Sequence, residues 1–403
     1  MGVKINKGTI VYIGGFELPD KNAAAHRVLN NGKVLRELGY EVVFIGIRHD
    51  IRDITTEEHQ GFRCWSIPYP VGTMQWLRYL SSTKILKQVV QQLEDVKGII
   101  FYNYQALALA KGMHFCKKRN MWSIVDVTEW YVASKSNVIF WAIKQFDTMI
   151  RMRFLNKRAD GVISISRYLN NYYNNKKRNV VQIPPLVDKS EEKWAGDIST
   201  DNGGQIKLVY AGSTSDMKDN LGIVLQAIYP YRDRLSMQIV GVDIEMLKKM
   251  LTDDLYEKYI GQHVNVHGRI SHLDCLEIIK KSDFQIFVRP KNLVTQAGFP
   301  TKLGESFACG TPVITNLSSN INDYFIDGTN GFLVEEVSKE QIGHVIEKII
   351  NLMDEDILRM KLFCKNSNLF DYHLYVEETH KFLVKIEEKK LARSINGEKS
   401  KKN

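Results

Sequence analysis

The residues best suited to chemistry stand close together in one stretch of the chain, residues 298–316. Lys302 supplies a positive charge, and Glu305 follows about one helical turn later. The start of a helix presents backbone N–H groups and the positive end of the helix dipole, which suit a phosphate. A carboxylate such as Glu305 accepts hydrogen bonds from sugar hydroxyl groups. The stretch therefore predicts a nucleoside diphosphate site with Lys302 near phosphate and Glu305 on ribose. The alternative is an ordinary connection with a solvated glutamate.

The elements that must position these residues follow from the same region. Residues 302–309 have helical character, and Gly310 suits the position that follows a helix. Pro300 fits the first turn, where its missing N–H group costs nothing. Apolar segments precede and follow this helix, at residues 284–288 and 312–315. The pattern predicts a strand, a loop that contains glycine, a short helix and a second strand.

The segment Pro300-Thr-Lys-Leu-Gly-Glu305 resembles the donor-binding signature of nucleotide-sugar glycosyltransferases of the GT-B class, especially the retaining family 4 type. It is similar to a variant found in bacterial surface-polysaccharide enzymes, Pro-Ser-Lys-x-x-Glu. The resemblance implies that Glu305 binds the ribose. It also implies donor contacts from the rest of the signature, Gly298, Phe299, Pro300, Thr301, Lys302 and Leu303.

One position departs from the family signature. The family usually carries an earlier glutamate, and that position is Ala297 here. The departure indicates either a changed contact with the donor sugar or a loss of activity. The variant signature often lacks this glutamate, which favours a changed contact. Gln296, or the backbone of Gly298 and Phe299, would then take its place.

Length and composition limit the kind of protein. The chain has 403 residues, 44% hydrophobic and 25% charged, which is typical of a globular protein and favours two domains of about 180 residues. The five cysteines form no CxxC pair and no signal peptide is evident, which indicates reduced thiols in a cytosolic protein. No apolar run approaches the roughly 20 residues that span a bilayer. The formal charge of +9 favours an anionic partner.

The first half of the chain begins with a βαβ pattern. Residues 9–13 form an apolar strand pattern that ends at Gly14 and Gly15, residues 22–38 have helical periodicity, and residues 41–47 are the next strand. The glycine pair lacks the GxGxxG spacing of a dinucleotide site, which counts against a dehydrogenase. In the resembled family this first loop lies near the acceptor and the donor.

The alternation of strand and helix patterns continues along the chain. It predicts an α/β protein with two Rossmann-like, doubly wound parallel-sheet domains facing across a cleft, the GT-B arrangement implied by the resemblance. Further strands are expected in the first half at residues 62–67, 98–102, 122–127, 161–166 and 179–183. In the second half they are expected from residue 206 and at 236–240, 264–267, 284–288, 312–315 and 331–334.

Two acidic residues lie at the end of one predicted strand. Asp126 and Glu129 stand at the carboxyl end of the strand at 122–127, on the side of a doubly wound sheet where ligands bind. Family members often carry a histidine or an acidic residue there, so the resemblance makes both residues catalytic candidates. The alternative is a pair of capping carboxylates at the start of a helix.

Two stretches of the first half mix aromatic and basic residues at helical spacing, residues 74–93 and 137–157. Such helices can lie on an anionic membrane surface, with their apolar face buried and Lys or Arg towards the headgroups. They can equally be amphipathic helices packed on the sheet. An anionic membrane surface is therefore one of the expected partners, and it would suit a lipid-linked acceptor.

The second domain is expected to bind the donor diphosphate. Its first strand ends at Gly212, and the following loop of the resembled family carries an arginine and a lysine on the diphosphate. Ser213 stands at the arginine position and Lys218 at the lysine position. Arg269 lies in a turn that faces the nucleobase in the family, and Arg289 ends the strand at 284–288, where it is a further phosphate candidate. Lys218 and Lys302 are the expected catalytic cations, since cations stabilise charge on a departing diphosphate.

The domain boundaries follow from composition and from the resemblance. Residues 1–188 are expected to form the acceptor-side domain, because Ile183-Pro-Pro-Leu-Val-Asp188 resembles the hinge phrase of the family. Residues 189–371 are expected to bind the nucleotide sugar, starting with a polar linker at 189–205. The helix at 372–393 is expected to cross back to the first domain, and the basic tail at 394–403 to be disordered.

The expected function is transfer of a sugar from a UDP- or GDP-linked donor to a glycan or polyprenyl-lipid-linked acceptor, with retention, in surface-polysaccharide biosynthesis. The nucleotide sugar is a co-substrate, and no cofactor or metal is expected. The expected location is the cytoplasm or the inner face of the plasma membrane. The alternatives are a nucleotide-sugar 2-epimerase of the same fold and a non-catalytic nucleotide- or glycan-binding module. Nucleic-acid binding is disfavoured, because the basic residues are dispersed.

Overall fold

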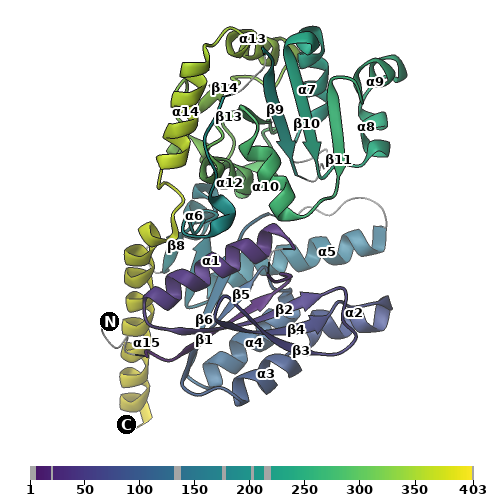
Figure 1. Ribbon diagram of the computed structural model, residues 1–403. Coiled ribbons are helices and arrows are strands. Elements are labelled where there is room, and N and C mark those ends of the chain that lie inside the picture. Colours follow the sequence, from purple (N-terminus) through teal and green to yellow (C-terminus); the bar gives the residue numbers. More distant parts are fainter. Residues whose placement is uncertain are drawn as a thin grey trace. The chain divides into compact units, whose positions relative to one another are not determined.

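The structure is a computed structural model that describes residues 6–19, 21–130, 138–174, 178–200, 204–212 and 219–401. The chain divides into two compact units (Figure 1). Unit 1 comprises Met1–Leu186 and Tyr372–Asn403, and unit 2 comprises Val187–Asp371. The change from unit 1 to unit 2 at Leu186 falls inside the segment that resembles a hinge phrase.

Unit 1 is built on an eight-stranded sheet with the order β3-β4-β2-β1-β5-β6-β7-β8. All neighbouring strands are parallel except β3 and β4, which are antiparallel. The strands are β1 Thr9–Gly14, β2 Glu41–Arg48, β3 Thr55–His59, β4 Phe62–Pro68, β5 Val96–Tyr102, β6 Trp122–Val127, β7 Gly161–Ser164 and β8 Val180–Gln182.

The edge strand β3 was not predicted from the sequence. Its residues, Thr-Thr-Glu-Glu-His, are polar and only partly buried, so no apolar pattern marks it. Pairing with β4 as an edge strand supplies its backbone hydrogen bonds. Strands β1 and β6, by contrast, are buried along their whole length, as expected in a parallel sheet covered on both faces.

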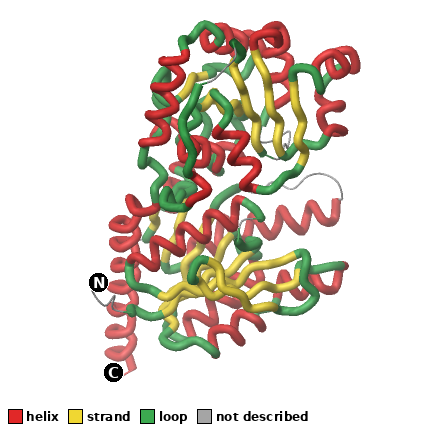
Figure 2. The backbone as a smooth tube through the Cα atoms, viewed as in Figure 1, coloured by secondary structure: helices red, strands yellow, loops and turns green. Residues whose placement is uncertain are grey.

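Helices cover both faces of the sheet of unit 1 (Figure 2). They are α1 Ala23–Glu37, α2 Gly72–Ser81, α3 Lys84–Gln91, α4 Ala106–Lys118, α5 Val138–Ile150, α6 Arg167–Tyr173 and α15 Val376–Lys401, with a short π-helix, η1 Arg151–Leu155, and two short 3₁₀ helices, η2 Asn156–Arg158 and η6 Tyr372–Tyr375. The side chain of Asn22 caps α1 by accepting a hydrogen bond from Ala25 N at 2.9 Å.

The last helix, α15, belongs to unit 1 and packs against α1 and β8. Phe382, Leu383 and Ile386 of this helix are buried in the same core as the residues of α1. The helix continues to Lys401, so the prediction of a disordered tail from residue 394 is wrong for residues 394–401. An established helix adds residues at little cost, and this segment contains no proline to stop it.

Unit 2 is built on a six-stranded parallel sheet with the order β11-β10-β9-β12-β13-β14. Its strands are β9 Ile206–Ala211, β10 Leu235–Val240, β11 Val264–Gly268, β12 Phe284–Phe287, β13 Val313–Thr315 and β14 Gly331–Leu333. Its helices are α7 Leu221–Ile228, α8 Ile244–Met250, α9 Asp253–Tyr259, α10 His272–Lys280, α11 Leu293–Ala297, α12 Thr301–Cys309, α13 Lys339–Ile349 and α14 Asp354–Asn366, with short turns η3 Glu192–Trp194, η4 Tyr229–Arg234 and η5 Ile321–Asp323. The predicted class, two doubly wound α/β domains, is confirmed.

A buried ion pair ties α1 to the sheet of unit 1. Arg27 Nη2 lies 2.7 Å from Asp126 Oδ1, and these side chains are 2% and 0% exposed. Tyr12 donates its hydroxyl to Asp126 Oδ2 at 2.5 Å, and Arg27 Nη1 donates to the carbonyl oxygen of Ile183 at 2.8 Å. The pair therefore joins α1, β1, β6 and the chain that follows β8. Burial, and then the Asp126 carboxylate, raise the pKa of Tyr12.

The buried pair predicts a stability effect. In Asp126→Asn, Arg27 keeps its charge in the core without a carboxylate, and we expect the stability of unit 1 to fall by about 3 kcal/mol or more. Urea unfolding followed by tryptophan fluorescence measures this, with Asp53→Asn as the control because Asp53 is exposed. An Asp126→Asn protein of unchanged stability would contradict the structural role and favour the catalytic one.

Candidate functional site

The predicted strand-loop-helix-strand unit is present in unit 2. It consists of β12, the short helix α11, the helix α12 and β13. Gly310 ends α12 with a φ of 76°, the left-handed conformation that glycine adopts readily. Pro300 lies immediately before the first helical residue, Thr301. Phe299 anchors this entry, because its ring packs against those of Tyr324 and Phe370, with centroids 5.5 and 6.1 Å away.

Lys302, in the first turn of α12, forms a close ion pair with Asp219. Its Nζ lies 2.5 Å from Asp219 Oδ2, and the two side chains are 15% and 6% exposed. Tyr210, in β9, donates its hydroxyl to the same carboxylate oxygen at 2.7 Å, and its ring centroid lies 4.1 Å from Lys302 Nζ. Burial lowers the pKa of the Lys302 ammonium. Burial alone would raise the pKa of Asp219, but Lys302, Tyr210 and Arg289 together outweigh it, and this pKa lies below the ordinary value.

Arg289 approaches the same carboxylate from the end of β12. Its Nε lies 3.8 Å from Asp219 Oδ1, and the residue is 6% exposed. Asn316 holds the backbone of Arg289 on both sides, accepting from its N–H at 2.7 Å and donating to its carbonyl oxygen at 2.8 Å. Burial lowers the pKa of Arg289. Lys302 and Arg289 were predicted separately from the sequence as phosphate ligands. Both lie beside the carboxylate of Asp219, which was not predicted as a site residue.

Glycines end three neighbouring strands beside this cluster. Gly212, Gly241 and Gly268 have φ values of 144°, 85° and 61° and stand at the carboxyl ends of β9, β10 and β11. A Cβ atom on Gly212 would lie 2.7 Å from Lys302 Cε, so a side chain there would displace the lysine. Gly241 was not proposed from the sequence, although its place at a strand end resembles that of Gly212.

Glu305 lies about one turn beyond Lys302, on α12. Its Oε1 is 3.6 Å from His272 Nε2, and the two side chains are 23% and 17% exposed. His272 is the first residue of α10, whose start is capped by Ser271. The sequence did not propose His272, although it follows the turn that contains Arg269. Arg269 itself is exposed.

Two of the predicted donor residues lie outside the described part of the chain. Ser213 and Lys218 fall within residues 213–218, so their expected contacts with the diphosphate stay predictions. The first described residue after this segment is Asp219, which precedes α7.

The position of the family's earlier glutamate is the end of α11. Ala297 is fully buried there. The helix begins with a capping box in which Thr295 N donates to Asn292 Oδ1 at 2.9 Å. Gln296, the residue named as a substitute contact, is half-buried, whereas Gly298, Phe299 and Leu303 are buried.

The two predicted glycines of unit 1 differ in their surroundings. Gly14 is buried at the end of β1, where a Cβ atom would lie 2.6 Å from the carbonyl oxygen of Tyr102, so packing alone requires glycine there. Gly15 is exposed, and a Cβ atom would come no nearer than 3.8 Å, to the hydroxyl of Tyr79. Only Gly15 therefore has surface available to a ligand.

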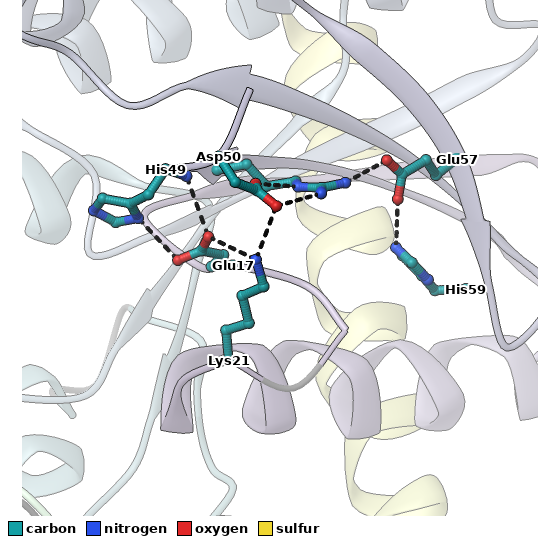
Figure 3. A network of polar contacts seen from close by, with 7 residues as sticks. Glu17, Lys21, His49, Asp50, Glu57 and His59 are labelled. Carbon is teal, nitrogen blue, oxygen red and sulfur yellow. Dashed lines mark hydrogen bonds and ion pairs between the residues drawn. The ribbon is translucent and has the colours of Figure 1, made fainter. Parts of the chain in front are cut away.

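The loop that follows Gly15 is fastened to the end of β2 by a polar network (Figure 3). Glu17 accepts a hydrogen bond from His49 N at 3.2 Å and lies 2.9 Å from His49 Nδ1. Lys21 Nζ links this loop to Asp50 at 3.2 Å. Burial raises the pKa of Glu17, but the hydrogen bonds from His49 outweigh it and the pKa lies below its ordinary value. Glu17 is thus a charged anchor of the loop.

The two acidic candidates of unit 1 also differ in exposure. Asp126 is fully buried in its contacts with Arg27 and Tyr12, a geometry that favours a structural role over contact with a substrate. Glu129, three residues further on, is half-buried. Of the two, only Glu129 has surface with which to meet a ligand.

Comparison with known proteins gives one family match. Residues 197–362 match the family model described as glycosyl transferases group 1. Over 229 residues the chain is 24% identical to an uncharacterized glycosyltransferase of Methanocaldococcus jannaschii. The aligned region is 54% of this chain and 55% of the archaeal protein, so the match spans about half the length of this curated relative.

Solved structures resemble the chain over almost its whole length. The catalytic domain of starch synthase IV from Arabidopsis thaliana, bound to ADP and acarbose, has a TM-score of 0.70 and 12% identity, with 94% of this chain and 99% of that chain covered. Sucrose-phosphate synthase from Thermosynechococcus elongatus has a TM-score of 0.68 and 15% identity, with the same coverage. Anabaena HepE in complex with UDP and glucose has a TM-score of 0.65 and 13% identity, again with 94% and 99% covered.

These structures share the GT-B fold, and at such low identity they establish the fold alone. The α/β units described above and this likeness agree in the fold class. The family match falls on the part of unit 2 that contains Asp219, Arg289, Lys302 and Glu305. Together, the fold and the match support a glycosyltransferase of the GT-B fold.

Proposed function

We propose that the protein is a retaining, family 4-like glycosyltransferase that moves a sugar from a UDP- or GDP-linked donor to a glycan or polyprenyl-lipid-linked acceptor. Surface-polysaccharide biosynthesis is the setting we propose. One observation carries the proposal: two largely buried cations, Lys302 in the first turn of α12 and Arg289 just after β12, converge on the carboxylate of Asp219. Buried cations beside a helix N-terminus suit a diphosphate. The UDP and ADP bound in two of the structural relatives are consistent with such a donor.

The geometry suggests a role for each residue. Lys302 and Arg289 would bind the diphosphate and stabilise its charge as the sugar leaves, an electrostatic contribution made by groups already in place. Glu305 would accept hydrogen bonds from the ribose hydroxyls, and His272 beside it would orient its carboxylate. In this proposal the departing phosphate helps to deprotonate the acceptor hydroxyl, and no metal or other cofactor takes part.

Two other functions fit the same fold. A nucleotide-sugar 2-epimerase would convert the donor without an acceptor, so turnover of the nucleotide sugar alone would favour it. A non-catalytic module would bind nucleotide without any turnover, and Ala297 in the place of the usual glutamate is the feature that favours it. Transfer assays with and without acceptor separate the three.

Unit 1 carries exposed apolar residues that support a membrane-bound acceptor. Helices α2 and α5 both pack on α4. Asp147 of α5 accepts a hydrogen bond from Ala106 N at 2.7 Å, and Lys111 of α4 donates to the carbonyl oxygen of Ser81, at the end of α2, at 2.9 Å. We call the exposed apolar residues of these helices and of η1 the apolar surface: Met74, Leu77, Leu107, Trp141, Ile143, Phe146, Met149 and Phe154.

The charged residues near the apolar surface indicate which partner it binds. Arg78 and Arg153 are exposed on elements that carry the apolar surface, and Arg158 is exposed on the adjoining η2. The only acidic residue of α2, α5, η1 and η2 is Asp147, which is held by the start of α4. Apolar side chains flanked by arginine match the interface of an anionic bilayer. Within the described residues no helix is long and apolar enough to cross a membrane, so the contact we propose is peripheral.

The donor proposal predicts selective binding of one nucleoside diphosphate. In a panel of UDP, GDP, ADP and CDP, we expect one to raise the melting temperature of the protein clearly, because a ligand of the native state stabilises it. Lys302→Met should then weaken binding about tenfold or more, the usual loss of a charged hydrogen bond. Lys291→Met is the matched control, since Lys291 is exposed in the same unit. No shift with any diphosphate at millimolar concentration would contradict the donor site.

The membrane proposal predicts binding to anionic vesicles. We expect the protein to float with phosphatidylglycerol-containing liposomes at low salt and to be released as salt is raised. Phe146→Glu combined with Phe154→Glu should abolish flotation, whereas Met353→Glu, at an exposed residue of unit 2, should not. Absence of flotation in the wild type would refute the contact. If the double variant instead turned a dimer into a monomer, the apolar surface would be a contact between copies.

A further inference from the structure

We propose that Asp219 is a positioning residue that holds Lys302 and Arg289 together and sets the pH range over which they bind a diphosphate. The inference rests on the proposed function, because it takes the diphosphate to meet Lys302. It adds a residue that neither the sequence analysis nor the resemblance singled out. It also assigns a role to a carboxylate whose charge alone would repel the ligand.

The position of Asp219 is fixed from several sides. The next residue, Asn220, donates its backbone N–H to the carbonyl oxygen of Val288 at 2.9 Å, which joins the start of α7 to the end of β12. Tyr210 of β9 donates to the Asp219 carboxylate at 2.7 Å. The same carboxylate contacts Lys302 at 2.5 Å and Arg289 at 3.8 Å. Asp219 therefore connects β9, β12, α7 and α12 at the carboxyl edge of the sheet.

Among the described residues, two cations contact the single carboxylate of Asp219. Lys302 and Arg289 together carry two positive charges, and Asp219 carries one negative charge, so the group keeps a net positive charge when all three are ionised. All three side chains are largely buried, at 15%, 7% and 6% exposure respectively. Two cations this close would repel each other strongly without a carboxylate between them. Asp219 thus lets both cations stay charged and still leaves attraction for an anion.

The titration of Lys302 depends on the groups that face it. Among the described residues these are Asp219, Arg289, Glu305 on its own helix, Cys275 on α10 and Tyr210 on β9. Burial and Arg289 lower the pKa of the ammonium, and Asp219 and Glu305 raise it. Removing the charge of Asp219 therefore lowers the pKa of Lys302 further, and the lysine loses its proton at a lower pH.

Removing the charge of Asp219 is expected to change how diphosphate binding depends on pH. A neutral lysine no longer attracts a diphosphate, so binding is lost as pH rises through the pKa of Lys302. Asp219→Asn shifts this loss of binding to lower pH. At pH values below the pKa of Lys302 in the variant, the lysine is still charged. There the variant binds the diphosphate at least as tightly as the wild type, because the carboxylate that repels the diphosphate is gone. The affinities of the two proteins therefore cross between acid and alkaline pH.

The experiment measures the dissociation constant of UDP, or of GDP if GDP is the diphosphate that binds, by calorimetry between pH 6 and pH 9. We expect the affinity of the wild type to begin to fall at a higher pH than that of Asp219→Asn. For Asp219→Asn we expect affinity to fall about tenfold for each pH unit above the pKa of Lys302. Tyr210→Phe removes a neutral hydrogen bond to the same carboxylate and should show no such crossing.

A second variant separates an effect of charge on binding from an effect on folding. In Asp219→Asn combined with Lys302→Arg, the guanidinium keeps its proton throughout this pH range, so the pH dependence should disappear. Circular dichroism at each pH checks that the variants are folded. If the wild type binds no diphosphate at any pH, the proposed function fails. If the wild type binds and Asp219→Asn parallels it, or is weaker by the same factor at every pH, the role of Asp219 in setting the charge is overturned.

Discussion

The close ion pair between Lys302 and Asp219 is the interaction on which the account of unit 2 depends. In a parallel sheet the carboxyl ends of all strands meet at one edge, so groups from distant parts of the sequence come together there. The pair joins the first turn of α12 to the residue before α7, and Arg289 adds the end of β12. Gly212 leaves the space that Lys302 occupies. Unit 1 contains a similar ion pair between Asp126 and Arg27, but that pair lies wholly inside the core.

This contrast explains why we assign a structural role to Asp126 and a place in the candidate site to Asp219. Asp126 and Arg27 bond to each other and to neighbouring core groups, so their charges cancel within the core. Around Asp219, two cations share one carboxylate, and Lys302 keeps some exposed surface. A diphosphate bound beside Lys302 and Arg289 would meet two positive charges that share the Asp219 carboxylate.

Much of the fold could be predicted from local patterns. Buried parallel strands such as β1 and β6 are continuous apolar runs, and Gly310 marks the end of α12, so both could be read from residue type alone. The strand β3 could not, because a polar edge strand carries no apolar signal. The extension of α15 beyond residue 394 depends on a helix already nucleated upstream. In the site, Lys302 and Glu305 were proposed from their motif, and Arg289 from its strand end. Asp219 and His272 were missed, because their importance comes from tertiary contacts that spacing does not encode.

The most direct test of the central claim is a crystal structure of the full chain with the nucleoside diphosphate that binds best. We expect the phosphate oxygens to lie within hydrogen-bond distance of Lys302 Nζ and of backbone N–H groups in the first turn of α12. The ribose hydroxyls should meet Glu305. A nucleotide bound with its phosphates away from Lys302 and Arg289 would contradict the account, even if the protein proved to transfer sugars.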